Sequence, residues 1–372
     1  MVNAGAVCEQ RSITTTALVS VWSRHLLTFV YPVMTFAFLV SGPHRWWTAL
    51  LWMIPGTMLD FSDDYSGREL RQPRADLPGW PFDSLLYAHF LLQLINVALL
   101  VHLFTVQSFW SVDAFIAVQF VGGASGVSGI VVAHELIHRR QKHLQLMGRI
   151  LMGTVLYEHF STEHVRGHHL RVGTPEDPAT ARFGETFSGF LRRTVPGQFR
   201  SAWRLETKRL GDENMAWSDS RLVHSRVFQG LLAEWSVAAA ILLLAGAAAF
   251  GVFVLQAVMA IGALEGVNYF EHWGLMRSGR KVRPVDSWDS DARFTYYSLV
   301  GLTRHADHHA HASRPYQALH LFEDSPRLPR GYHGMLRLVF FQNRRFQRVM
   351  TEELRRRQLG PFAPMAAAGE VE

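Results

Sequence analysis

Long apolar blocks separated by polar segments dominate the hydrophobic pattern of this chain. An α-helix needs about 20 predominantly apolar residues to span a bilayer, and six blocks reach or approach that length. They cover residues 19–40, 46–59, 85–106, 112–133, 231–250 and 252–269. The second block is the shortest, and Pro55 lies near its end. The pattern therefore predicts an all-α membrane protein with six transmembrane helices.

The same pattern predicts a single integral membrane domain with a tail on each side. The domain covers residues 15–350, and the tails are a polar N-terminal segment, 1–14, and a C-terminal segment, 351–372. Hydrophobic residues make up 48% of the chain and charged residues only 18%. This balance is too apolar for an ordinary soluble surface, which supports the membrane assignment.

Basic residues are distributed unevenly among the segments that connect the apolar blocks. The chain has 37 Lys and Arg against 31 Asp and Glu. Arginine accumulates in the long segments 61–83, 139–230 and 273–372, whereas Arg45 is the one basic residue of the short joints 41–45, 107–111 and 251. Cytoplasmic loops carry the excess of Lys and Arg. We therefore predict that the long segments and both termini are cytoplasmic.

Nine histidines form four short clusters close to the ends of these blocks. The clusters are His134-Glu135-Leu136-Ile137-His138, Glu163-His164 with His168-His169, Glu271-His272, and His305 with His308-His309. On a helix, residues three or four apart share one face, so the histidines of a cluster project together. Counted from a cytoplasmic N-terminus, His134 follows four crossings and His272 follows six. All four clusters are thus expected at the cytoplasmic mouth of one bundle.

This arrangement predicts a metal centre with histidine ligands. Imidazole suits iron, zinc, copper and nickel, and the single cysteine, Cys8, excludes a multi-cysteine site. Nine donors exceed what one ion holds, so we predict two ions with positions left open for oxygen or water. The predicted ligands are His134, His138, His164, His168, His169, His272, His305, His308 and His309.

Several acidic residues are candidate partners of these ligands. A ligating histidine usually donates its second N–H to a carboxylate or a carbonyl oxygen. The candidates are Glu135, Glu163, Glu265, Glu271, Asp60 and Asp307. By contrast, Glu176 and Asp177 follow Pro175, and their types and positions are also typical of turn or helix-capping residues.

At these residues the chain resembles the membrane alkane 1-monooxygenase family, relatives of the membrane fatty acid desaturases. The resemblance covers roughly residues 15–350. The motifs that carry it are His134–His138, Glu163–His169 with Thr174–Ala179, Asn268–Leu275, Leu302–His311, Tyr316–Leu319 and Leu328–Gly334. Three segments depart from the family pattern. Trp273 stands where Tyr is usual, Asp286-Ser-Trp-Asp289 replaces His-Ser-Trp-Asn, and Phe340-Phe-Gln-Asn-Arg replaces an apolar Pro-containing stretch.

The resemblance implies a six-span bundle of a bacterial inner membrane in which the nine histidines hold two non-haem irons. It also implies hydroxylation of the terminal methyl of n-alkanes to 1-alkanols with O2 and two electrons. Family members take these electrons from rubredoxin, which a rubredoxin reductase reduces. A fused rubredoxin would need four cysteines, so the donor is expected to be a separate protein, and an acidic carrier would suit the basic face. No nucleic-acid partner is expected.

The resemblance also assigns a residue to the substrate channel. Trp52 lies eight residues before Asp60 and matches the family position where a bulky side chain limits chain length. An interior packing role is the alternative for a tryptophan. The channel assignment predicts that Trp52→Ser lengthens the accepted alkane.

Four alternatives remain open at this point. A fatty acid desaturase shares three of the clusters, although the one at His272 favours hydroxylation. Hydroxylation of a methyl group on an aromatic or terpenoid substrate is the second. A zinc peptidase would use His134, Glu135 and His138 as an HExxH motif and would leave seven histidines without a role. A metal transporter tends to bind near the bilayer midplane, whereas these clusters lie at the inner rim.

Overall fold

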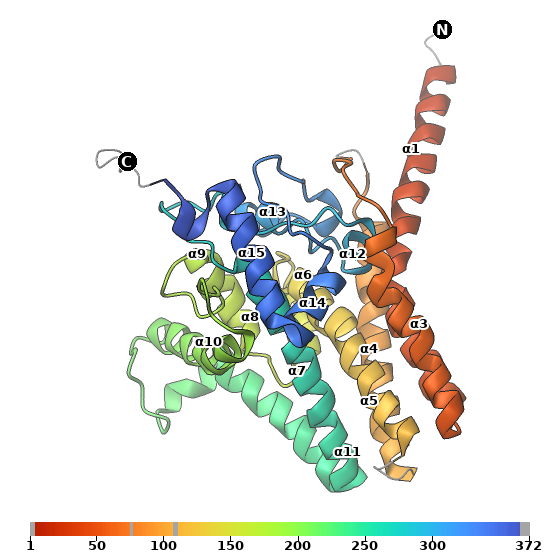
Figure 1. Ribbon diagram of the computed structural model, residues 1–372. Coiled ribbons are helices and arrows are strands. Elements are labelled where there is room, and N and C mark those ends of the chain that lie inside the picture. Colours follow the sequence, from red (N-terminus) through yellow and green to blue (C-terminus); the bar gives the residue numbers. More distant parts are fainter. Residues whose placement is uncertain (1–3, 75–76, 107–110, 365–372) are drawn as a thin grey trace.

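The computed structural model describes residues 4–74, 77–106 and 111–364, with side chains from Thr15 onward, and is almost entirely helical (Figure 1). The first half contains α1 Ala4–His25, η1 Leu26–Phe29, α2 Val30–Ser41, α3 Trp46–Tyr65, α4 Trp80–Val106, α5 Val112–Ala124, η2 Ser125–Val131, α6 Val132–Ile137, α7 Lys142–Gly153, α8 Phe160–Glu163, η3 His164–His168 and α9 His169–Arg171. The second half contains α10 Phe187–Arg209, η4 Ser220–His224, α11 Arg226–His272, η5 Pro284–Asp286, α12 Arg293–Ser298, α13 His305–Ala310, η6 Tyr316–Ala318, α14 Tyr332–Phe341, α15 Asn343–Arg357 and η7 Gly360–Phe362. In the described part of the chain, extended backbone pairs only at two isolated bridges, Arg68 with Ala292 and Asp289 with Arg327.

Four of the described helical stretches are long and apolar enough to cross a membrane. They are Thr15–Ser41, Trp80–Val106, Val112–Ile137 and Arg226–His272. Three coincide with the predicted spans 19–40, 85–106 and 112–133, and the fourth contains both of the last two. The predicted joint at 107–111 lies, apart from Ser111, outside the described residues.

The helix α11 folds back on itself and forms two arms (Figure 1). Gly246 has φ 90° and ψ 174°, a non-helical conformation inside a 47-residue stretch. Glycine adopts positive φ without the steric cost that a Cβ imposes. The turn therefore lies at Gly246, which corrects the joint predicted at residue 251.

The helix α3 is the one predicted span that does not meet the criteria of length and hydropathy. It has 20 residues, but its last two turns contain Asp60, Asp63 and Asp64. In Figure 1 it runs alongside the other long helices, and it packs against α5 and α14.

Two short π-helical segments interrupt the helices that carry histidines. One, η2, joins α5 to α6, and the other, η3, contains His164 and His168. The π-helix is rare and often marks functional sites. Each segment changes the helical register just before or within a histidine cluster, so simple i, i+4 spacing does not fix where those side chains point.

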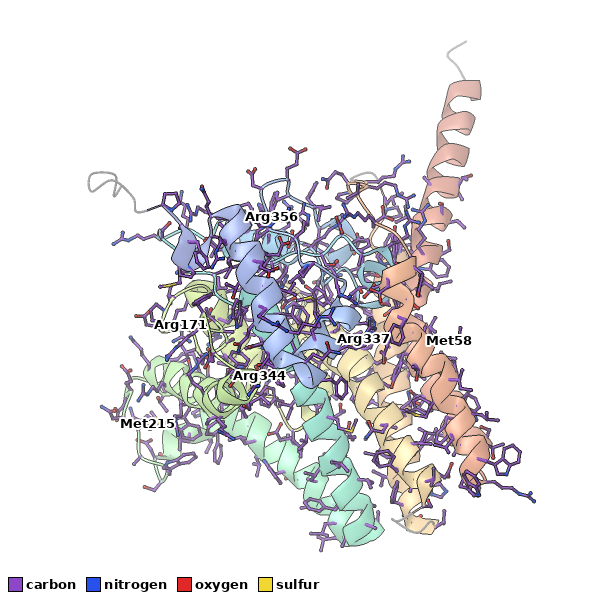
Figure 2. All side chains as sticks on the ribbon, viewed as in Figure 1. Met58, Arg171, Met215, Arg337, Arg344 and Arg356 are labelled. Carbon is purple, nitrogen blue, oxygen red and sulfur yellow. The ribbon has the colours of Figure 1, made fainter. Side chains whose placement is uncertain are left out.

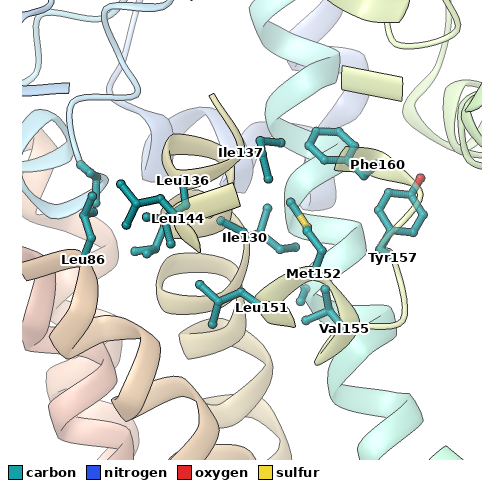
Figure 3. Packing of buried hydrophobic residues seen from close by; sticks show 14 of the residues in the cluster. Leu86, Ile130, Leu136, Ile137, Leu144, Leu151, Met152, Val155, Tyr157 and Phe160 are labelled. Atoms are coloured by element: carbon teal, nitrogen blue, oxygen red, sulfur yellow. The ribbon is translucent and has the colours of Figure 1, made fainter. Parts of the chain in front are cut away.

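A buried hydrophobic cluster fixes α6 against its neighbours (Figure 3). Its labelled members are Leu86, Ile130, Leu136, Ile137, Leu144, Leu151, Met152, Val155, Tyr157 and Phe160. Burying one such side chain contributes about 1.5–3 kcal/mol. A Cβ on Gly148 of α7 would lie 2.8 Å from Ile137, so α7 approaches α6 closely and the helix bearing His134 has little freedom to move.

Apolar and charged side chains are concentrated on different parts of the surface. Leu243 and Leu244, beside the Gly246 turn, are 82% and 87% exposed, and Met58 lies on the outer side of α3 (Figure 2). Arg337 and Arg356 lie on α14 and α15, in the half of the molecule that also contains α13 (Figure 2). This half is called the histidine end below.

Candidate metal centre

All nine predicted histidine ligands meet at the histidine end. They come from α6 and its C-terminal end, from η3 and α9, from the last residue of α11, and from α13. They form two groups of four buried side chains, His134, His138, His164, His308 and His168, His272, His305, His309. Within each group, one candidate ligand atom per residue lies within 4.8 Å of all the others.

The ninth histidine, His169, adds a further nitrogen to the first group. Its Nε2 lies 3.1 Å from Nε2 of His164 and 3.1 Å from Nε2 of His308. Its ring centroid is also 4.6 Å from that of His309, so His169 packs between the two groups.

The spacing and burial of these nitrogens fit bound metal ions. Typical metal–imidazole distances are about 2.0–2.1 Å, so nitrogens on opposite sides of one ion lie about 4 Å apart, within the observed spread. Nε2 of His138 and Nε2 of His168 are buried without a hydrogen-bond partner. A cation between the rings would satisfy these orphaned nitrogens.

Electrostatics keep these imidazoles in the form that binds metal. Burial, followed by repulsion from neighbouring imidazoles, lowers the pKa of His164, His169 and His308 well below the ordinary histidine value. A neutral imidazole has a free lone pair, which is what a metal ion requires.

Asp177 binds the second ring nitrogen of one predicted ligand, His168. His168 Nδ1 lies 2.8 Å from Asp177 Oδ2, which also accepts from the Thr180 hydroxyl at 2.6 Å. Burial raises the pKa of Asp177, but its interaction with His168 and the hydrogen bond from Thr180 lower it by more, so the result is below the ordinary value. The contact directs Nε2 of His168 toward its group. Asp177 also accepts from the backbone N–H of Ala179, so the turn role considered from the sequence is present as well.

Glu271 faces the second group differently from the prediction. Its Oε2 lies 3.3 Å from Nε2 of His305, and that nitrogen is itself 3.1 Å from Nε2 of His272. The other oxygen, Oε1, accepts from the Tyr332 hydroxyl. The carboxylate therefore points to the place where the nitrogens converge, instead of supporting a ligand ring from behind.

The other five predicted acids have different partners. Among the described residues, none of them accepts a hydrogen bond from any of the nine histidines. Glu135 pairs with Arg139, Glu163 with Arg171, Asp307 with His311 and Arg314, Glu265 with Tyr157, Gln198 and Asn268, and Asp60 with His333. These contacts brace the elements around the centre.

Asp289 holds the helix that supplies three histidines, a role that the sequence did not reveal. Its Oδ1 accepts from the backbone N–H of Ala306 at 2.8 Å, and its Oδ2 accepts from the Ser325 hydroxyl at 2.6 Å. Asp289 is fully buried. Its partner at the start of α13 is 17 residues away, and no local sequence pattern predicts such a contact.

An apolar cavity of ≈ 220 Å³ ends at the histidines. His134, His164 and His305 line one part of it. Other lining residues come from η1, α2, α3, α5, η2, α11, α12, the loop after α12, and α14, among them Tyr31, Leu59, Asp60, Gly123, Ile130, Ala263, Asn268, Leu302 and Leu336. No described lining residue is a lysine or an arginine.

Trp52 is not among the residues that line this cavity. Its ring packs against Phe38 and His44, with centroids 5.8 and 6.1 Å away. The structure thus gives Trp52 the packing environment that was the alternative to its assignment to the channel.

Comparisons with known proteins agree with this geometry. Residues 108–338, which contain all nine histidines, match the fatty acid desaturase family. The chain is 42% identical over 232 residues to alkane 1-monooxygenase 2 of Pseudomonas aeruginosa, covering 59% of each protein. It is 38% identical over 223 residues to the alkane 1-monooxygenase of Acinetobacter baylyi, covering 56% of this chain and 53% of that protein.

A more distant relative is named for aromatic hydrocarbons. The chain is 26% identical over 207 residues to the xylene/toluene monooxygenase hydroxylase component XylM of Pseudomonas putida, and the match covers 55% of each protein. In all three pairs the aligned part spans less than two thirds of the relative's length.

Proposed function

The chain belongs to the fatty acid desaturase family, and from this premise we propose that it is an integral-membrane, non-haem di-iron monooxygenase. The proposed reaction is hydroxylation of the terminal methyl of n-alkanes to 1-alkanols. O2 is the oxidant, and a separate rubredoxin, reduced by a rubredoxin reductase, supplies the electrons. The observation that carries the proposal is an apolar cavity ending at two groups of buried histidines. The similar alkane 1-monooxygenases support it.

Two irons would be held by different sets of residues. His134, His138, His164, His169 and His308 would hold the first. The second would be held by His168, His272, His305 and His309, with the Glu271 carboxylate as a fifth donor. When bound, the irons supply the oxygen activation and C–H chemistry that amino-acid side chains lack.

The protein would position an alkane by shape alone. Burial of apolar surface contributes about 25 cal/mol per Å², and an alkane has no polar group to hold. The walls of the cavity exclude water, while His134 and His305 mark the end where the reacting methyl would lie. Asn268 lines the same cavity but donates its side-chain N–H to Glu265, so it is already paired and need not bind substrate.

The proposed membrane arrangement has six spans, with the histidine end in the cytoplasm at the bacterial inner membrane. Three of the long apolar stretches, the two arms of the fourth, α11, and the packed helix α3 are compatible with six crossings. Both termini would be cytoplasmic. The arginines of α14 and α15 would then face the side from which a soluble rubredoxin approaches.

The cavity favours an alkane over a free fatty acid. A carboxylate brought into an apolar pocket is costly unless a cationic side chain pairs with it. No lysine or arginine occurs among the described residues that line the cavity. A methyl-substituted aromatic remains the second candidate, because the XylM relative is named for xylene and toluene.

Product analysis tests the function most simply. The chain would be expressed with a rubredoxin and its reductase and supplied with octane, hexadecane or a fatty acid. We expect the corresponding 1-alkanols by mass spectrometry, and their loss in His272→Ala together with a loss of bound iron. His224→Ala, which changes an exposed histidine outside both groups, serves as the matched control. An olefin as the main product, or full activity of His272→Ala, would contradict the proposal.

A further inference from the structure

We propose that Tyr31, packed on Gly123, closes the deep end of the apolar cavity and sets the longest alkyl chain that the cavity accepts. The inference rests on the proposed function, because it concerns the tail of the substrate. It assigns the limit on chain length to a residue other than Trp52.

The cavity follows one face of the continuous stretch from α5 to α6. Gly123, Gly126, Val127, Ile130 and His134 all line it. At a rise of about 1.5 Å per residue, the eleven residues from His134 to Gly123 correspond to roughly 16 Å. One end of this face is therefore at the metal centre, and the other is about three helical turns deeper in the bundle.

At that deep end, the ring of Tyr31 lies directly on the backbone of Gly123. A Cβ placed on Gly123 would lie 2.6 Å from Cε1 and 2.6 Å from Cζ of Tyr31. Such a separation is well inside van der Waals contact, so any larger residue would displace the ring. Both residues line the cavity, and in our proposal this contact is its closed end.

The space beyond Tyr31 is filled by aromatic rings. Tyr31 contacts Phe120 edge to face with centroids 6.1 Å apart, and Phe120 contacts Phe38 at 5.1 Å. Phe38 in turn contacts Trp52 at 5.8 Å. Phe38 and Phe120 are both buried. An alkyl chain growing away from the histidines meets Tyr31 first, and two more rings separate Tyr31 from Trp52.

A groove beside α3 provides the way in. Val30, Leu59 and Phe294 line both the cavity and a second, more open groove beside α3. That groove also contains Ile54 and Met58, which are 54% and 68% exposed. An alkane dissolved in lipid can enter the cavity from this groove.

The test compares product profiles from an equimolar series of n-alkanes in cells that also make rubredoxin and its reductase. Tyr31→Ala removes the ring, and we expect the ratio of the longest to the shortest 1-alkanol to rise about tenfold. This is the lower end of the discrimination between substrates that one methylene group gives in an apolar pocket. Tyr31→Phe keeps the ring and should leave the ratio unchanged. Gly123→Ala pushes the ring into the cavity and should lower the ratio.

Trp52→Ser in the same assay separates the two assignments. An unchanged profile in Tyr31→Ala, or a lengthened profile in Trp52→Ser alone, would overturn the inference. Should Tyr31→Ala fail to accumulate, Gly123→Ala still decides: a lowered ratio supports the inference and an unchanged ratio overturns it.

A binding measurement keeps this inference distinguishable from the proposed function. Purified protein without reductant would be melted in the presence of primary alcohols of graded length. We expect the length that stabilises best to increase in Tyr31→Ala relative to the parent. A parent that yields no alkanol from any alkane would contradict the proposed function, whereas an unshifted optimum length would contradict the role of Tyr31.

Discussion

Three carboxylates act on the histidine groups in three different ways. Asp177 binds Nδ1 of His168 and thereby directs its Nε2 inward. Glu271 faces the nitrogens themselves through Nε2 of His305. Asp289 touches no imidazole in the described structure and instead holds the backbone of α13 at Ala306. The orientation of the ligands thus depends on side chains from three separate segments.

Asp177→Ala should weaken metal binding without preventing membrane insertion. Losing the carboxylate that orients a ligating histidine typically costs about 10–100-fold in metal affinity, and His168 would lose its partner at 2.8 Å. Iron retained after dialysis against a graded chelator measures the effect. Glu176→Ala changes the neighbouring, exposed carboxylate and should behave as the parent. Equal iron retention in both variants would contradict the role given to Asp177.

The sequence was informative about the histidines and uninformative about most of their partners. Spacing of four on a helix brings His134 and His138 to one face, and the structure brings all nine histidines together. Asp177 reaches His168 through a turn nine residues further on, and such a contact has no periodic pattern. The five acids with other partners adjoin histidines or apolar blocks in the sequence, yet such positions do not fix where a side chain points.

At the scale of elements, ion pairs hold α10 beneath the metal centre. The Glu206 carboxylate is buried and lies 3.0 Å from Arg166, which is in η3, and 2.7 Å from Arg209. It also accepts from the backbone N–H of Arg226, at the start of α11, at 2.7 Å. One side chain therefore ties α10 to the second histidine cluster and to the long hairpin.

Glu206→Gln should lower the stability of the protein at neutral pH. Removing one partner of a buried ion pair costs about 3–5 kcal/mol, and partial exposure of both arginines reduces this to about 1–3 kcal/mol. Burial raises the pKa of Glu206, but hydrogen bonds from Arg209 and Arg226 lower it by more. The pKa of Glu206 is therefore below the ordinary glutamate value. A carboxyl group whose pKa is depressed on folding stabilises the fold at pH values above its unfolded-state pKa. This stabilisation is lost as the pH falls through the folded-state pKa.

Melting temperatures in detergent measure this difference across a pH series. The gap between parent and Glu206→Gln should be widest near neutral pH and should narrow as pH falls below about 4.3, the ordinary glutamate value. Glu213→Gln, on an exposed residue of the following loop, should show no gap. A gap that widens on acidification would contradict the ion-pair explanation.

Element boundaries followed from hydropathy only where polar residues interrupt the apolar pattern. The fourth span, predicted at 112–133, lies within the stretch Val112–Ile137. Hydropathy does not locate the turn of α11, because small apolar residues continue on both sides of Gly246 and leave no minimum there. The π-helical segments were not foreseen, because a five-residue hydrogen-bond step leaves no mark on apolar periodicity.

At the scale of the whole molecule, the fold places an apolar compartment next to a polar, histidine-lined one. The cavity opens beside α3, runs along α5 and η2, and ends at His134 and His305. Its depth depends on how Tyr31 of α2 packs on Gly123 of α5, and such a contact between helices cannot be derived from either segment alone. The class of chemistry was therefore accessible from motifs, whereas the shape of the cavity required the packed structure.

The number of irons per chain tests the central claim most directly. Elemental analysis of active, detergent-purified protein, with Mössbauer spectra of the iron-57-enriched sample, counts the ions and distinguishes their environments. We predict two irons per polypeptide in two inequivalent sites, one with five imidazoles and one with four imidazoles and a carboxylate. One iron per chain, or zinc in place of iron in active protein, would contradict the account.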